Sequence, residues 1–149
     1  MPTTLALGAD HAGFARKEAL KTWLEGQGYA VQDFGTHSEA SVDYPDFAHP
    51  LAAAVAAGQP ALGILLCGSA NGVCITANKH AGVRAALAWL PEIATLARQH
   101  NNANVLCLPA RYLTDAEAAA VAGAFLAASF EGGRHQRRVE KMDEGNFGC

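Results

Sequence analysis

Residues 64–73 read Ile64-Leu65-Leu66-Cys67-Gly68-Ser69-Ala70-Asn71-Gly72-Val73. The apolar run predicts a buried strand that ends at Cys67, and the small residues after it predict a turn with open backbone N–H groups. A helix that begins near Gly72 directs the positive end of its dipole at the same point, which favours an anion and lowers the pKa of a thiol. The stretch therefore predicts a cysteine thiolate beside an anion-binding turn.

Outward from this stretch, short apolar runs alternate with helical patterns. Strands are predicted at Leu5–Leu7, Tyr29–Val31, Ala61–Leu66, Val83–Ala88 and Asn104–Leu108. Helices are predicted at 14–27, 47–57 with Asp46 as its cap, 68–79 together with the turn, 91–100, 114–128 with the capping box Thr114-x-x-Glu117, and 134–143.

Strict alternation of strands and helices requires right-handed crossovers and a parallel sheet with helices on both faces. We therefore expect one domain over residues 1–149 with a doubly wound five-stranded α/β fold, flavodoxin- or Rossmann-like, and a C-terminal helix. The common strand order for such folds is 2-1-3-4-5, and ligands bind where this order reverses.

Composition limits the partners and the compartment. The chain has 11 basic and 14 acidic residues, a net charge of −3 and no basic tract, so we expect no nucleic acid partner. Apolar stretches are too short to span a membrane, and the first residues show no export signal. The four cysteines, at 67, 74, 107 and 149, form no C-x-x-C pair, which is typical of free thiols in a reducing cytoplasm.

The expected strand order brings the ends of strands one and three together, and with them Asp10, His11 and Cys67. Each residue also has a structural interpretation. Asp10 serves equally as a helix cap, His11 as a surface residue, and Cys67 as a small core residue, the role that we assign to Cys74 and Cys107.

The remaining polar residues have similar alternatives. His100 and Asn101 suit a polar helix C-terminus, and the arginines at 134, 137 and 138 suit a solvated helix face, although Gly132-Gly133 beside them favours an anion contact. The histidines at 37, 49, 80 and 135 are interpreted as surface residues. No two histidines have the i, i+4 spacing of a helical metal site, so we expect no metal and no cofactor.

Six motifs in order resemble the ribose-5-phosphate isomerase B family, which includes galactose-6-phosphate isomerase subunits. They are Gly8-x-Asp10-His11-x-Gly13, Asp43-Tyr44-Pro45, Cys67-Gly68-Ser69-x-x-Gly72, Ala77-Asn78-Lys79, Arg98-Gln99-His100-Asn101 with Asn104-Val105-Leu106, and Glu131-Gly132-Gly133-Arg134-His135-Gln136-x-Arg138-Val139. The resemblance covers nearly the whole chain.

The resemblance implies a metal-independent aldose–ketose isomerase of carbohydrate metabolism, acting on ribose 5-phosphate in the pentose phosphate pathway. By match to the family, Cys67 is the proton acceptor and His100 the proton donor that opens the sugar ring. Substrate contacts are implied for Asp10, His11, Tyr44, Gly68, Ser69, Ala70, Asn71, Gly72, Asn101, Arg111, Arg134 and Arg138. The family also implies a homodimer, or a dimer of dimers, in which two chains share each site. With the expected strand order, His100 lies two strand positions from Cys67, about 10 Å away.

The chemistry of the residues agrees with this role. An enediolate mechanism needs a base, donors for the developing oxyanion and an anchor for the phosphate, and Cys67, the 68–72 amides and the arginines supply them. Ala70 departs from the family, which often has glycine there, and such a residue requires either a negative φ or tolerated strain. Val73 occupies the position where some members carry a glutamate base. The tail Asn146-Phe147-Gly148-Cys149 and Arg137 have no assigned role.

Other functions remain open. The same chemistry serves isomerases of allose or galactose 6-phosphate or of tetrulose 4-phosphate. A cysteine phosphatase or arsenate reductase requires an arginine in a Cys-x5-Arg loop, where this chain has Val73. A non-catalytic nucleotide- or flavin-binding module on the same sheet would need neither Cys67 nor His100.

Overall fold

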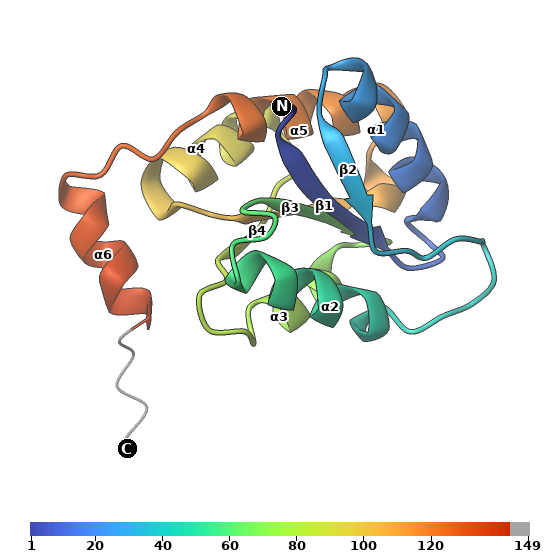
Figure 1. The fold of residues 1–149 in the computed structure, drawn as a ribbon, viewed down its shortest axis with the longest axis horizontal. Helices are drawn as coiled ribbons and strands as arrows, with labels where there is room; N and C mark the ends of the chain where they lie inside the picture. Colours follow the sequence, from blue (N-terminus) through green and yellow to red (C-terminus); the bar gives the residue numbers. More distant parts are fainter. Residues whose placement is uncertain (144–149) are drawn as a thin grey trace.

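The computed structural model describes residues 1–143, so the tail motif at 146–149 lies outside the described part. Five parallel strands form one sheet: β1 (Thr4–Ala9), β2 (Ala30–Asp33), β3 (Gly63–Cys67), β4 (Ala85–Leu87) and β5 (Val105–Pro109). The helices are α1 (Phe14–Gly26), α2 (Pro45–Ala56), α3 (Asn71–Ala77), α4 (Pro91–Asn101), α5 (Asp115–Ala127) and α6 (Arg134–Asp143), with a 3-10 turn at Ala110–Tyr112. The predicted doubly wound α/β fold is confirmed (Figure 1).

The predicted strand order is wrong at one edge of the sheet. The order is β2-β1-β3-β5-β4, so β5 pairs with β3 and β4 is the edge strand. β5 is buried along all five residues, whereas the three residues of β4 are only half-buried. A continuous apolar strand in a parallel sheet needs neighbours and helices on both sides, which places the longer β5 inside and leaves the short β4 at the edge.

Two hydrophobic cores lie on opposite faces of the sheet. Leu5, Leu7 and Ala9 of β1 pack against α1, α4 and α5, where Phe125 is fully buried. Ala6, the alternate residue of β1, packs on the other face with Leu51 of α2 and residues of α3. Figure 1 shows the same layers, with α1, α4 and α5 above the strands and α2 and α3 below them. The alternation of side chains along the strands therefore sets the three-layer architecture.

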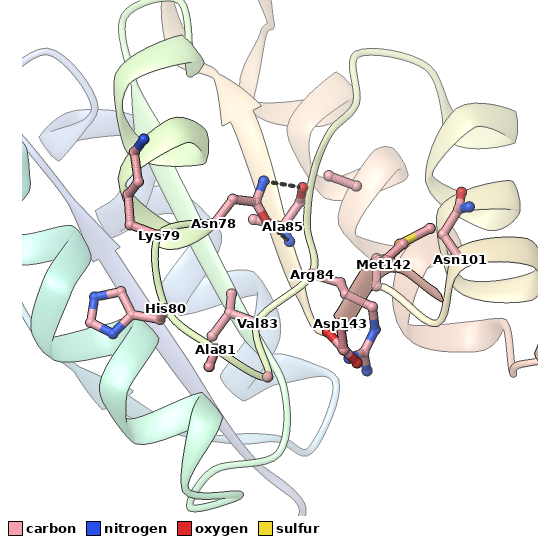
Figure 2. Close-up of a pocket in the computed structure, with 13 residues that line it drawn as sticks. Asn78, Lys79, His80, Ala81, Val83, Arg84, Ala85, Asn101, Met142 and Asp143 are labelled. Carbon is pink, nitrogen blue, oxygen red and sulfur yellow. Dashed lines mark hydrogen bonds and ion pairs between the residues drawn. The ribbon is translucent and has the colours of Figure 1, made fainter. Parts of the chain in front are cut away.

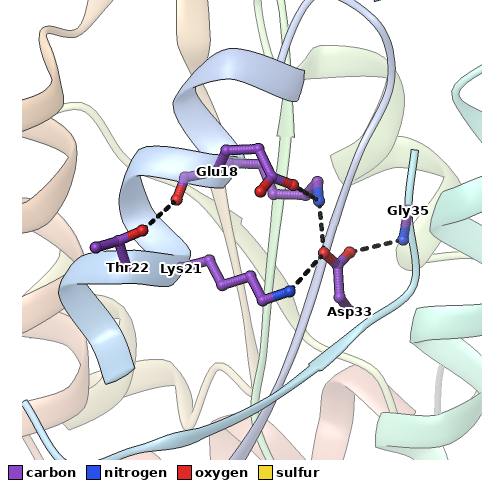
Figure 3. Close-up of polar contacts among 6 residues, drawn as sticks. Glu18, Lys21, Thr22, Asp33 and Gly35 are labelled. Carbon is purple, nitrogen blue, oxygen red and sulfur yellow. Dashed lines mark hydrogen bonds and ion pairs between the residues drawn. The ribbon is translucent and has the colours of Figure 1, made fainter. Parts of the chain in front are cut away.

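A buried lysine connects α1 to the end of β2. The Lys17 side chain is inaccessible to solvent, and its Nζ contacts Asp33 Oδ2 at 2.7 Å and Glu18 Oε1 at 2.8 Å. Figure 3 shows Glu18, Lys21 and Asp33 of this network. Asp33 also accepts a hydrogen bond from the Gly35 N–H at 2.9 Å. Burial alone raises the pKa of Asp33, but the hydrogen bonds from Lys17 and Gly35 and the lysine charge outweigh it and hold that pKa below its ordinary value. The network fixes the loop after β2 to α1.

Two element boundaries differ from the sequence prediction. α2 begins at Pro45 with Tyr44 at its N-cap, so Asp46 lies in the first turn instead of capping the helix, where its carboxylate still faces the positive dipole end. The helix after the cysteine turn is shorter than predicted, because it begins at Asn71 and ends at Ala77. No helix in residues 1–143 is long and apolar enough to cross a membrane.

Candidate active site

Cys67 is the last residue of β3, at the carboxyl edge of the sheet, as predicted. Cys67 as a residue is 5% exposed, and the turn that follows it leads into α3 at Asn71. The Ser69 hydroxyl, which is exposed, accepts hydrogen bonds from the backbone N–H and the side-chain amide of Asn71. Ala70 has φ of +65°, so the strained alternative left open by the sequence is the one that the chain adopts.

The pKa of Cys67 differs from the sequence expectation. Burial raises the pKa of the thiol above its ordinary value, and the charge of Asp10 adds to this increase. The backbone N–H groups of Val73, Ala70 and Gly72 act in the opposite direction, as the turn and the helix dipole predict, but they do not outweigh burial. In the isolated chain, therefore, burial favours the thiol form of Cys67 over the thiolate.

Asp10 and His11 follow β1 and lie beside the end of β3. The backbone N–H of Asp10 donates to the Leu66 carbonyl oxygen at 3.3 Å, which ties this loop to the residue before Cys67. The buried Asp10 carboxylate accepts a hydrogen bond from the Gly13 N–H at 3.1 Å, which closes the turn before α1. Gly13 is itself the N-cap of α1 and no side chain caps this helix, so the capping role that the sequence left open for Asp10 is wrong. His11 is half-buried, and its Nδ1 accepts from the Val42 N–H at 3.2 Å.

Tyr44 and Arg111 cover the turn from two sides. A Cβ atom placed on Gly72 would lie 2.5 Å from Tyr44 Cζ, and one placed on Gly68 would lie 2.9 Å from Arg111 Nη1. The Arg111 backbone N–H also donates to the Gly68 carbonyl oxygen at 3.1 Å. Both glycines therefore allow larger side chains to approach the turn, and Arg111 supplies a cation at the carboxyl edge of the same chain.

The other predicted site residues lie elsewhere. His100 and Asn101 end α4, which leads to the start of β5, at the amino edge of the sheet. Cys67 is paired with Pro109 at the other end of β5, and the strand between the two edges spans about 13 Å. Arg134 and Arg138 are exposed on α6, which packs on α4. The structure therefore divides the predicted set into two groups, and the expected separation of two strand positions is wrong.

A cluster that sequence analysis missed surrounds His100. The His135 ring stacks on the His100 ring with centroids 4.2 Å apart and planes 12° apart. A Glu131 carboxylate oxygen lies 3.7 Å from His100 Nε2 and 3.6 Å from His135 Nε2. His135 is 6% exposed, so its assignment to the surface is wrong: α6 turns this residue and Val139 toward α4. Desolvation, together with the charges of His100 and nearby arginines, lowers the pKa of His135. The i, i+4 spacing of Glu131 and His135 was the only available sequence signal.

A cavity of about 600 Å³ separates the loop after α3 from the end of α6. Figure 2 shows His80 on one side of it and Asn101 and Met142 on the other, with Arg84 beside Asp143. Arg84 Nη1 and Asp143 Oδ2 are 3.9 Å apart. Asn78 closes one wall, because its side chain donates to the Ala85 carbonyl oxygen at 2.9 Å. Of the predicted site residues only Asn101 lines this cavity, so it is distinct from the Cys67 turn.

Comparison with known proteins agrees with the sequence motifs. The sequence pattern of the family described as Ribose/Galactose Isomerase matches residues 5–142. A ribose-5-phosphate isomerase B from Escherichia coli K12 is 45% identical over 138 residues, 93% of each chain. A ribose 5-phosphate isomerase structure from Thermotoga maritima superposes with a TM-score of 0.93 at 46% identity, covering 95% of this chain and 98% of that one. The Mycoplasma genitalium ribose-5-phosphate isomerase B with bound ribulose-5-phosphate superposes with a TM-score of 0.90 at 45% identity, covering 95% and 94%.

Proposed function

Since this chain belongs to the Ribose/Galactose Isomerase family, we propose that it interconverts ribose 5-phosphate and ribulose 5-phosphate. The observation that carries the proposal is the likeness of the whole chain, at 45% identity, to an isomerase of known structure that holds ribulose-5-phosphate. Cys67 at the end of β3, beside a turn of small residues, supports the same conclusion independently.

The reaction is a proton transfer between neighbouring carbons. Cys67, as thiolate, takes the proton from C2 of the open-chain aldose, and the resulting enediolate carries negative charge on oxygen. The N–H groups of the turn at 68–72 stabilise this oxyanion. The hydroxyl proton on O2 moves to O1, and the thiol then returns its proton to C1, which gives the ketose with its carbonyl at C2. Asp10, His11 and Tyr44 border the turn and contact the sugar hydroxyls.

We assign ring opening and phosphate binding to groups from two chains. His100 donates a proton to the ring oxygen of the cyclic sugar, and Arg134 and Arg138 bind the phosphate with charge-assisted hydrogen bonds. Within one chain these residues are on the opposite edge of the sheet from Cys67. A two-fold homodimer, or a dimer of dimers, brings them over the partner's Cys67 turn, where Arg111 of that chain already lies. The added arginine charges also favour the thiolate that burial disfavours.

The family description also includes galactose, so a 6-phosphate hexose is the second candidate substrate. Purified protein should be assayed for aldose–ketose exchange with ribose 5-phosphate, allose 6-phosphate, galactose 6-phosphate and a tetrulose 4-phosphate, with the unphosphorylated sugars as controls. We expect the highest kcat/KM for ribose 5-phosphate. A preference for any other sugar phosphate would refute the substrate assignment, and no turnover at all would refute the isomerase.

The same assay tests the base. Cys67→Ala should reduce exchange of the substrate C2 proton with solvent by about 10²–10⁴-fold, the usual contribution of a general base, while phosphosugar binding is retained. Cys107→Ala, which removes another buried thiol on the neighbouring strand, is the matched control and should retain exchange. Exchange within about tenfold of the parent in Cys67→Ala would exclude it as the base.

A further inference from the structure

We propose that His100, Glu131 and His135 form a binding site for a divalent transition-metal ion of the Zn²⁺ class, and that an ion bound there inhibits the isomerase by occupying His100. The inhibitory part rests on the proposed function of His100 in ring opening. The binding part rests on the geometry of the three side chains alone, and it can be tested without any turnover.

The distances suit such an ion. One ligand atom from each side chain lies within 4.8 Å of the other two, and the Glu131 oxygen is 3.6–3.7 Å from both Nε2 atoms. In a tetrahedral zinc site with bonds of about 2.0–2.2 Å, neighbouring ligand atoms lie about 3.4 Å apart. The carboxylate is thus within a few tenths of an ångström of the required position relative to each histidine. Among residues 1–143 this is the only such group of three.

His135 provides the second observation. Its side chain is 8% exposed, and its Nε2 atom is buried without a hydrogen-bond partner. A buried unpaired polar atom is unfavourable unless a partner fills its vicinity, and a cation between this atom and Glu131 would pair it. The 3.6 Å gap to Glu131 is too long for a hydrogen bond, so the carboxylate does not fulfil that role by itself.

Two histidines and one carboxylate match the preference of Zn²⁺ for imidazole nitrogen and carboxylate oxygen, and they leave a fourth position for water. The stacked rings require one adjustment, because a shared ion must lie near the plane of each imidazole. His135 is fixed by burial, whereas the His100 side chain is 36% exposed and can tilt toward the ion. Arg134 is close in sequence and opposes the ion electrostatically, so we expect weaker binding than at a structural zinc site.

Metal-free full-length protein should be titrated with Zn²⁺ by calorimetry and with Co²⁺ by visible absorption, which reports tetrahedral coordination. We expect one ion per chain, and at least about tenfold weaker binding in Glu131→Gln and in His135→Gln, since even loss of a ligand's supporting contact weakens metal sites by about 10–100-fold. His49→Gln is the control, because His49 and His80 form the other close histidine pair, at 2.7 Å. It should leave binding unchanged.

Unchanged affinity in both Glu131→Gln and His135→Gln, or a sulfur-to-cobalt charge-transfer band, would overturn the site. For inhibition, Zn²⁺ should slow turnover of ribose 5-phosphate much more than turnover of a tetrose 4-phosphate that cannot form a ring, and Glu131→Gln should lose this effect. If Zn²⁺ slowed the turnover of both substrates equally, the proposal that the ion inhibits by occupying His100 would be overturned. If the protein binds the ion but isomerises no sugar phosphate, the proposed function fails and the metal site remains.

Discussion

Ala70 is the residue at which the cysteine turn departs from ordinary backbone geometry. Its φ of +65° is disfavoured for an L-residue by about 1–2 kcal/mol, and its methyl group is fully buried in the core between the sheet and α2 and α3. Burial of that methyl group stabilises the fold by about 0.8 kcal/mol. Alanine also loses less backbone entropy on folding than glycine would, which stabilises the fold further by about 0.5–1 kcal/mol. The cost of the positive φ and the two stabilising contributions are equal within their ranges, which explains how alanine is tolerated here.

We therefore expect Ala70→Gly to leave the free energy of unfolding within about 0.7 kcal/mol of the parent, although it removes a buried methyl group. Ala52→Gly is the matched control, because Ala52 is also fully buried in the same core but lies inside α2. It has no strain to relieve and should lose about 2 kcal/mol. Urea unfolding at equal protein concentration measures both, and an equal loss in the two variants would contradict strain at Ala70.

At the scale of elements, the sequence was sufficient for the succession of strands and helices along the chain and for the Cys67 turn, although not for the bounds of α2 and α3, since each element depends on local periodicity and turn chemistry. It was insufficient for the order of β4 and β5, because the alternating pattern is the same for either order and only relative burial separates them. The burial of Lys17 and of His135 was also missed. Both depend on partners from other elements, Asp33 for the lysine and α4 for the histidine.

The Lys17–Asp33 contact should make stability depend on pH. The pKa of Asp33 is lower in the folded chain than in the unfolded chain. The ionised carboxylate therefore makes its full contribution to the free energy of unfolding above the unfolded pKa of about 3.9, and this contribution is lost as the pH falls through the folded pKa. Asp33→Asn should lose about 2–3 kcal/mol at pH 7, because Lys17 stays buried with only Glu18 as a charged partner. The difference from the parent should shrink between pH 4 and the acid transition.

Lys21→Met is the control for this network. Lys21 lies 3.4 Å from the same Asp33 oxygen, but its side chain is about one-third exposed, so its loss should be no more than about 1 kcal/mol. Chemical unfolding at several pH values gives the free energy of unfolding of the parent, Asp33→Asn and Lys21→Met as a function of pH. A difference between Asp33→Asn and the parent that does not change with pH would show that the carboxylate acts only as a hydrogen-bond acceptor.

For the whole molecule, the residues of the proposed site fall into two separate groups in the described chain. Asp10, Cys67 and Arg111 lie at the carboxyl edge of the sheet, and His100 and Arg138 lie on the helices beside its amino edge. Figure 1 shows α6 standing away from the sheet on the α4 side, at the opposite end of the view from α1. Within one chain, the sheet itself separates the two groups of residues. In a two-fold dimer, α4 and α6 of each chain need only contact the Cys67 turn of the other chain for the two groups to meet.

A shared site predicts that two inactive variants restore each other. Cys67→Ala and His100→Ala should each be inactive alone, but a mixed dimer holds one site with both substitutions and one site with neither. Random pairing makes about half of the dimers mixed and half of their sites whole, so co-expression should restore about a quarter of the parent activity. Two different affinity tags allow the heterodimer to be isolated and its activity compared with both parents. If isolated heterodimer had no activity above the parents, Cys67 and His100 would have to act within one chain, which the separation of the two sheet edges in this structure opposes.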